Sequence, residues 1–160
     1  MSDFDELYAA HFDRLTVQLY AHTGDAALAQ DLVQEAFCRA LQRWDKLSTY
    51  DDPVGWVRRV AWNLASNRFH RTRRHFLFLR HQREQHVPAL NPDHVALTTA
   101  LATLPPNHRK VVIMHYLADQ SVAEIAQQCG VAEGTVKSWL HRGRTALAAA
   151  MSEQEGASRA

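Results

Sequence analysis

The chain has 160 residues, of which 46% are hydrophobic and 22% are charged. This length and composition fit one globular domain or two small ones, and they exclude a large multidomain enzyme or a chain that is disordered as a whole. No apolar run approaches the roughly 20 residues that cross a bilayer, and the acidic start lacks the basic-then-apolar order of a secretion signal. We therefore expect a cytoplasmic protein with no direct membrane insertion.

The net charge of +1 hides a segregation of charge along the chain. Residues 1–52 hold four basic and ten acidic side chains, a net charge of −6. Residues 53–86 hold eight basic side chains and one acidic, a net charge of +7, and residues 87–160 hold six of each. An acidic block followed by a basic block indicates two partners of opposite charge.

Apolar residues recur at helical spacing through the first half of the chain. Residues 3–22 predict one helix and residues 25–44 a second, for which Asp25 is the expected N-cap. The face predicted to be buried on the second helix consists of Leu28, Leu32, Ala36, Phe37, Ala40, Leu41 and Trp44. A loop over residues 47–53 then ends in a helix start, because Asp52 accepts free amide hydrogens and Pro53 has none to satisfy.

The third helix is expected to run from Pro53 to about Arg74, with a buried stripe of Val54, Val57, Val60, Ala61, Leu64 and Ala65. Residues 75–94 lose the periodicity and contain Pro88 and Pro92, which predicts a linker. A short helix is expected at about 94–103. After the break at Pro105-Pro106, another helix should reach Leu117.

The next segment predicts a helix-turn-helix. Ser121 and Glu124 have capping-box spacing, and Gly130 turns the chain. The final helix starts at about Glu133 and should bury Val136, Leu140, Gly143 and Leu147. Residues 151–160 are interpreted as a disordered tail. No strand pattern appears, so the predicted class is all-α.

The second helix of such a motif enters the major groove of DNA. From Gly134 to Thr145 this helix has no carboxylate, and it carries basic and polar residues away from its buried seam. Arg can bind guanine O6 and N7 with two bonds, while Ser, Thr and Lys mostly hold phosphates. The pattern favours DNA binding over the alternative, a solvated basic helix without a ligand.

Three segments resemble a known family, in the same order. Residues 109–116 (RKVVIMHY), 121–126 (SVAEIA) and 133–144 (EGTVKSWLHRGR) are similar to region 4 of bacterial RNA polymerase sigma factors of the extracytoplasmic-function (ECF, group 4) class. Residues 25–37 (DAALAQDLVQEAF) resemble the region 2 helix that binds core polymerase. Residues 56–63 (WVRRVAWN) are similar to the helix that reads the −10 promoter element.

The resemblance implies region 2 at residues 1–75, a flexible linker at 76–93, region 4 at 94–150 and the tail at 151–160. Its implied function is transcription initiation. The factor binds core RNA polymerase, through the clamp of the largest catalytic subunit and the flap of the second largest, and directs it to −10 and −35 elements while assisting DNA melting. Whether an anti-sigma factor binds stays open, as do the promoter and the inducing signal.

Each implied contact falls on particular residues of this sequence. Core binding is expected at Asp31, Gln34, Glu35 and Cys38, whose i, i+3, i+4, i+7 spacing places them on one face; a plain solvated acidic face is the alternative. Contacts to the −10 element are expected at Ser48, Tyr50, Asp51, Trp56, Arg59, Asn63, Arg68 and Arg71. Arg58, Arg73 and Arg74 should meet phosphates nearby. Contacts to the −35 element are expected at Thr135, Lys137, Ser138, His141, Arg142 and Arg144.

Several residues have two interpretations. Trp62 is either core or a surface on which DNA bases stack, and core is commoner for an aromatic residue on a helix. Trp139 departs from the family, which often has a polar or basic residue there. The histidines His70, His75, His81 and His86 lack ligand spacing and a cysteine partner, so we expect no metal site. Cys38 and Cys129 are expected to be reduced, partly buried thiols.

Two functions of other classes remain. A helix-turn-helix promoter-binding regulator without polymerase contact would not need the acidic face of residues 25–44. An enzyme is not indicated, because the sequence has no GxxxxGK[ST], HExxH or GxSxG motif and no His/Cys cluster. We therefore expect no catalytic residues and no cofactor.

Overall fold

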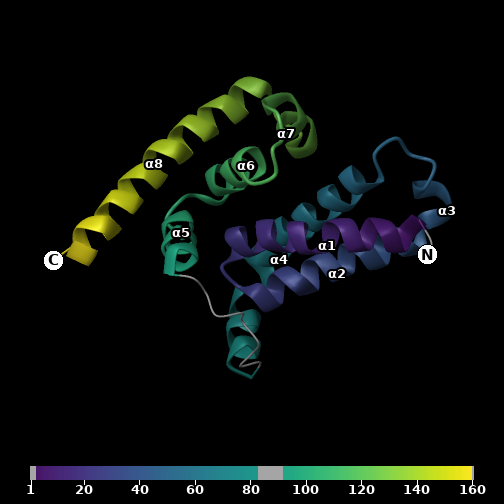
Figure 1. Ribbon diagram of the computed structural model, residues 1–160, viewed down its shortest axis with the longest axis horizontal. Helices are drawn as coiled ribbons and strands as arrows, with labels where there is room; N and C mark the ends of the chain where they lie inside the picture. Colours follow the sequence, from purple (N-terminus) through teal and green to yellow (C-terminus); the bar gives the residue numbers. More distant parts are fainter. Residues whose placement is uncertain (1–2, 83–91, 160) are drawn as a thin grey trace. The chain divides into compact units, whose positions relative to one another are not determined.

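A computed structural model describes the backbone of residues 3–82 and 92–159 and the side chains of residues 3–67 and 93–159. Every regular element in these ranges is a helix (Figure 1). The chain divides into two compact units, Met1–Val87 and Pro88–Ala160. The predicted all-α class is therefore confirmed.

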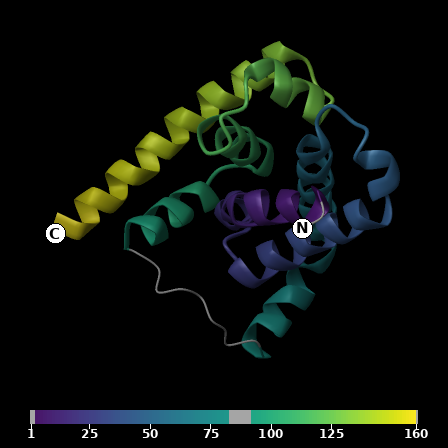
Figure 2. The ribbon, with the colours of Figure 1, turned by 45° about the vertical axis from the view of Figure 1, so that its right-hand side comes forward.

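The first unit contains α1 (Asp3–Thr23), α2 (Ala26–Gln42), the short α3 (Trp44–Leu47) and α4 (Pro53–Gln82). Helices α1, α2 and α4 pack against one another, and α1 lies beside α2 in both views (Figures 1 and 2). Their contact buries an apolar core, because each helix repeats apolar residues every three or four positions. The largest side chains fully buried in this core are Trp62, Phe37, Leu19, Leu32, Leu47, Val33 and Val57.

Two side-chain caps begin helices where the sequence predicts them. Asp25 accepts a hydrogen bond from the Leu28 amide at 3.1 Å, and Asp52 accepts one from the Gly55 amide at 3.0 Å. Each carboxylate satisfies an amide that has no partner within its own helix. The caps thereby fix the starts of α2 and α4.

The second helix ends earlier than predicted. Arg43 leaves the helical conformation at φ −114° and ψ 15°, and Trp44 begins α3 instead of closing the buried face of α2. Leu41 is 57% exposed, so its predicted burial was wrong. The physical reason is its position at the edge of the apolar stripe, since α2 ends one residue later and the described part of the first unit leaves that edge exposed.

The fourth helix is longer than predicted, because its backbone stays helical to Gln82. The predicted end of this helix near Arg74 was wrong. Residues 75–82 lose apolar periodicity but contain no Gly or Pro, so nothing in them breaks a helix. Residues 83–91 of the predicted linker lie outside the described part of the chain.

The second unit contains α5 (Pro92–Ala102), α6 (Pro106–Tyr116), α7 (Val122–Cys129) and α8 (Glu133–Arg159). Helix α8 packs against the other three helices of this unit. Buried Val112, Ile125, Val136 and Leu140 lie in this core. The unit therefore buries the seam that the sequence predicted for the final helix, although Leu147 is only half-buried.

The predicted helix-turn-helix is formed by α7 and α8. Ser121 caps α7 by accepting from the Glu124 amide at 3.1 Å, and its hydroxyl also reaches the Glu124 carboxylate at 3.2 Å. Gly130 ends α7 in the left-handed region, at φ 69° and ψ 34°, which a residue with a Cβ rarely adopts. This turn sets the direction in which α8 leaves.

A buried arginine joins α5 to α6. Arg109 is 6% exposed, and its guanidinium donates to the carbonyl oxygens of Leu101 and Leu104, each at 2.9 Å. These carbonyls belong to the end of α5 and the turn after it, where the Leu101 carbonyl also accepts the Leu104 amide at 3.1 Å. Arg109 therefore closes the end of α5, a role that the sequence alone did not indicate.

The predicted disordered tail is helical instead. Helix α8 continues to Arg159, and Leu147, Ala150, Met151 and Gln154 are half-buried at helical spacing. Residues 146–155 contain mainly Ala, Leu, Met, Glu and Gln, which are strong helix formers. The prediction was wrong because it weighed the polar composition and not this half-buried stripe.

Candidate functional sites

The expected core-binding residues share one face of α2. Asp31, Gln34 and Cys38 are exposed and Glu35 is half-buried. Leu41 extends this face, since it lies three positions after Cys38 and seven after Gln34. We call Asp31, Gln34, Glu35, Cys38 and Leu41 the α2 face. It combines two carboxylates, an amide and an exposed apolar side chain.

Two polar groups of the α2 face already have partners within the chain. Gln34 accepts a hydrogen bond from the hydroxyl of Tyr8 on α1, at 3.1 Å. Glu35 forms an ion pair with Arg39, one helical turn later, at 2.9 Å. An exposed pair at i, i+4 spacing is worth only about 0.3–0.5 kcal/mol, so a stronger partner can displace Arg39.

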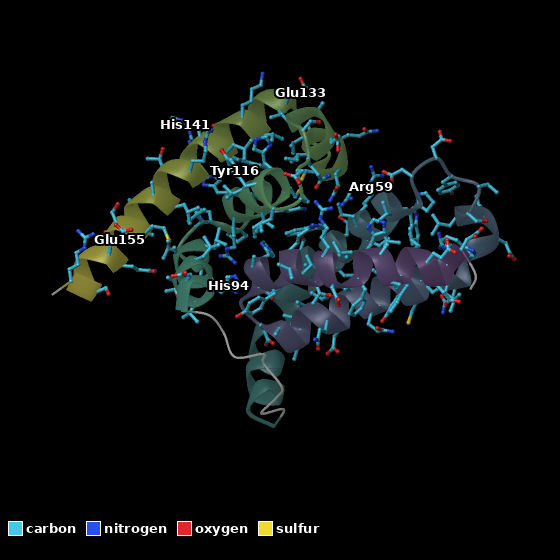
Figure 3. All side chains as sticks on the ribbon, viewed as in Figure 1. Arg59, His94, Tyr116, Glu133, His141 and Glu155 are labelled. Atoms are coloured by element: carbon cyan, nitrogen blue, oxygen red, sulfur yellow. The ribbon has the colours of Figure 1, made fainter. Side chains whose placement is uncertain are left out.

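The expected −10 residues lie in the loop before α4 and on α4 itself. Ser48, Tyr50 and Asp51 are exposed in the loop, and Arg59 and Asn63 are exposed on α4, where Arg59 is labelled in Figure 3. Trp56 is half-buried. The side chains of Arg68, Arg71, Arg73 and Arg74 lie outside the described residues. Loop and helix thus present polar and aromatic groups together in one unit.

Charges at the start of α4 act on His11 of α1. Partial burial lowers the pKa of His11 below its usual 6.5, and the nearby charges of Arg58 and Arg14 lower it further. The carboxylate of Asp52 acts in the opposite direction. His11 is therefore held towards its neutral form.

The expected −35 residues lie on α8, mostly away from its buried seam. Lys137, Ser138, His141, Arg142 and Arg144 are exposed, and Thr135 is half-buried. Figure 3 labels His141 on this helix. Val136, Leu140 and Gly143 are buried on the opposite side. Because these side chains are exposed opposite the buried seam, α8 has the geometry of a recognition helix.

One member of this set contacts the preceding helix. Arg144 donates to the hydroxyl oxygen of Tyr116 on α6 at 3.1 Å. Tyr116 is 52% exposed, so both groups remain accessible on the surface. The hydroxyl of Thr145 donates to the His141 carbonyl at 2.9 Å, within its own helix. Arg144 and Thr145 are therefore less free to contact bases than Ser138 or Arg142.

The tryptophans differ in their surroundings. Trp62 is 0% exposed and its ring lies 5.1 Å from that of His22, so it is a core residue and not a surface for stacking bases. Trp139 is half-buried. Trp44, which was expected in α2, packs edge to face on Phe4 with ring centroids 5.5 Å apart.

The cysteines are both free thiols in different surroundings. Cys38 is exposed, which corrects its expected partial burial, and Cys129 is half-buried as expected. Burial raises the pKa of the Cys129 thiol, against a smaller opposite effect of Lys110. Cys38 is thus the more accessible thiol of the two.

Among the described residues, no group of three or more His, Cys, Asp or Glu side chains is placed to hold a metal ion. The side chains of His70, His75, His81 and His86 lie outside that range. The helices within residues 3–82 and 92–159 are too short or too polar to span a membrane.

Three residues of these surfaces were not predicted: Tyr8, Leu41 and Tyr116. Tyr8 bonds to Gln34, 26 positions later, and Tyr116 bonds to Arg144, 28 positions later. No local pattern in the sequence reveals contacts between residues so far apart. Leu41 did carry a signal, because its helical position lies beside Gln34 and Cys38. Because leucine is apolar, it was predicted to lie on the buried face instead.

Comparison with known families assigns both units. Residues 7–75 match Sigma-70 region 2, and residues 94–147 match Sigma-70 region 4. Two helical units with these regions in this order define a protein of the sigma-70 class. The matches cover the α2 face, the loop before α4 and the helix-turn-helix.

Full-length relatives define the family more closely. The chain is 36% identical over 158 residues to the ECF RNA polymerase sigma factor SigL of Mycobacterium tuberculosis, covering 94% of this chain and 87% of SigL. It is 32% identical to the ECF sigma factor SigE of Mycolicibacterium smegmatis, covering 92% of this chain and 61% of SigE. The chain belongs to the ECF family of RNA polymerase sigma factors.

Solved structures share the fold. The sigma factor RpoE of Bartonella quintana, solved with the anti-sigma factor NepR, has a TM-score of 0.77 and 22% identity, with 95% of this chain and 98% of RpoE covered. CnrH, solved with the cytosolic domain of CnrY, has a TM-score of 0.69 and 21% identity, covering 94% and 88%. At such identities the likeness supports the fold alone.

Proposed function

We propose that this chain is a transcription initiation factor that binds core RNA polymerase, directs it to promoters with −10 and −35 elements, and assists DNA melting. The observation that carries the proposal is the placement of three polar surfaces, on α2, on the loop with α4, and on α8. A sigma factor needs all three surfaces: one to bind core polymerase, one for the −10 element and one for the −35 element. The role is non-catalytic and cytoplasmic.

The α2 face is assigned to the clamp of the largest catalytic subunit. Its carboxylates, Asp31 and Glu35, suit a basic surface, and exposed Leu41 adds apolar area. The flap of the second largest subunit is assigned to the second unit. An anti-sigma partner is also proposed, because RpoE was solved with the anti-sigma factor NepR.

The loop before α4 and the exposed side of this helix are assigned to the −10 element. DNA opening requires a base to leave the stack and be held by polar or aromatic groups. Tyr50, Arg59 and Asn63 are exposed and supply an aromatic ring, a cation and an amide. The net charge of +7 over residues 53–86 favours the phosphate backbone.

The exposed side of α8 is assigned to the −35 element. Arg142 and Ser138 lie opposite the buried seam, where a helix in the major groove presents its side chains. Lys137 and His141 add positive or polar groups along the flank.

The test is reconstitution of core polymerase with this chain, followed by sequencing of the transcripts that it starts. A variant with Asp31→Lys and Glu35→Lys should lose at least about 2 kcal/mol of core binding if these residues are hot spots, with the helical fold intact. Cys38 supplies a second readout, since its exposed thiol should be alkylated in the free chain and protected in the complex.

The alternative function, a helix-turn-helix regulator without polymerase contact, predicts that neither the wild type nor the reversed variant binds core polymerase. Co-purification of the reversed variant with core enzyme at wild-type level would contradict the assignment of the α2 face. Unchanged alkylation of Cys38 in the complex would do the same. Specific transcripts that depend on the chain would still separate an initiation factor from a regulator.

A further inference from the structure

One exposed contact ties α1 to the α2 face. The hydroxyl of Tyr8 donates to Oε1 of Gln34 at 3.1 Å. The bond occupies the acceptor end of the amide and leaves the Nε2 hydrogens without a role in this contact. Gln34 therefore presents its donor end from a face whose other polar groups include the carboxylates of Asp31 and Glu35.

Aromatic packing holds the Tyr8 ring in place. Its centroid lies 4.8 Å from that of Phe12 and 5.0 Å from that of Phe37, and the Phe37 ring meets it edge to face at 72°. Phe37 is 1% exposed and belongs to the core. Because the ring packs against rings of its own helix and of α2, its hydroxyl is a fixed donor and not a mobile one.

A glutamine on an exposed helix face otherwise samples many rotamers, and a binding partner must immobilise it. A hydrogen bond from a fixed hydroxyl removes part of that freedom before binding. It also selects which end of the amide points away from Tyr8. Both effects favour a partner that offers an acceptor oxygen at that position.

We propose that Tyr8 is a positioning residue for polymerase binding, whose hydroxyl orients the Gln34 amide so that its N–H donors meet a carbonyl or carboxylate oxygen of core polymerase. The inference rests on the proposed function of the α2 face. It adds a residue of α1 that makes its contribution through Gln34.

The test measures the affinity of the full chain for core polymerase in a double-mutant cycle. Tyr8→Phe keeps the ring and removes the hydroxyl, and Gln34→Met keeps the length of the side chain and removes the amide. Tyr8→Phe should weaken binding about threefold in the wild-type background and have no further effect beside Gln34→Met. Thermal unfolding of Tyr8→Phe should be unchanged, because the ring contacts remain.

Tyr20→Phe is the matched control, since it removes a hydroxyl from the same helix three turns away from Tyr8. Its affinity for core polymerase should equal that of the wild type. If Tyr8→Phe binds core polymerase with wild-type affinity, the inference is overturned. It is also overturned if Tyr8→Phe weakens binding equally in the wild-type and Gln34→Met backgrounds.

The charge-reversed variant distinguishes this failure from that of the proposed function. If Asp31→Lys with Glu35→Lys binds core polymerase normally, the α2 face is not the interface, and the role of Tyr8 is overturned with it. If that variant loses binding while Tyr8→Phe is neutral, the interface stands and only the positioning role is overturned.

Discussion

A Cβ built on Gly143 of α8 would lie 2.6 Å from Cγ2 of Val112 on α6, closer than two carbon atoms can approach. The same Cβ would be 3.3 Å from the carbonyl oxygen of His108. The main chain at His108 cannot rotate away, and Val112 is 4% exposed in the core. Glycine at this position allows the two helices to come together.

Gly143→Ala should therefore destabilise the second unit. Alanine gains up to about 1 kcal/mol in a helix interior, but overpacking of a tight contact costs about 1–3 kcal/mol. We expect a net loss of roughly 1–2 kcal/mol, measured as faster hydrogen exchange in peptides of α6 and α8.

Gly156 supplies the control, because nothing lies within 4 Å of a Cβ built there. Gly156→Ala should leave exchange unchanged or slow it slightly near the end of α8. Equal protection of Gly143→Ala and the wild type would show that α6 and α8 can separate at no cost.

His11 predicts a pH dependence of stability. Burial, Arg58 and Arg14 lower its pKa in the folded state below the usual 6.5, so the unfolded chain binds a proton at a higher pH than the folded chain. Stability from this group is complete above pH 6.5 and declines as the pH falls through and below that value. Glutamine does not titrate, so the His11→Gln variant should lose less stability than the wild type when the pH is lowered from 7.5 to 5.5.

The measurement is urea unfolding followed by circular dichroism at pH 7.5 and pH 5.5. The quantity of interest is the difference between wild type and variant, because the chain has 10 histidines that can all contribute to the absolute change. Parallel losses in the two proteins would contradict a lowered pKa at His11.

Much of the fold follows from local signals in the sequence. The caps at Asp25, Asp52 and Ser121 and the turn at Gly130 were predictable, because each depends on residues within four positions of one another. The seam of Val136, Leu140 and Gly143 follows from helical periodicity. These features also place the helix-turn-helix, so the exposed side of α8, which is proposed to bind the −35 element, was predictable in outline.

Features that depend on contacts between distant residues were not predictable. The burial of Arg109 against the end of α5, the half-buried stripe near Met151 and the hydrogen bond of Tyr8 to Gln34 require the positions of two helices. Exposure of Leu41 depends on where α2 ends. The sequence predicts which residues share a helix face, but only packing determines which face is covered.

Asn63 provides a test of the opening step. Its side chain is exposed on α4, one turn after Arg59, so Asn63→Ala should not disturb folding. If its amide holds the edge of an extruded base, the variant should initiate slowly on duplex promoters. Its initiation rate on a template with a pre-opened, mismatched −10 region should fall much less. Its affinity for core polymerase should also change little. Normal initiation on duplex DNA would leave Asn63 without a role in opening.

The exposed side of α8 should separate base reading from phosphate binding. Arg142 lies on the same side as Ser138, opposite the buried seam, and Lys137 lies on the flank. Arg142→Ala should cost about 1–3 kcal/mol and relax selectivity at one position of the −35 element. Lys137→Ala should weaken all sequences alike and reduce the salt slope by about 1.

Binding of both variants to a panel of single-base promoter variants, at two salt concentrations, checks this assignment. Arg144→Ala extends the panel, since its guanidinium is bonded to Tyr116 and should contribute less to selectivity than that of Arg142. If Arg142→Ala weakens every promoter variant equally, Arg142 is a phosphate contact. The base-reading residues must then lie elsewhere on α8, with Ser138 and His141 as the next exposed side chains to replace.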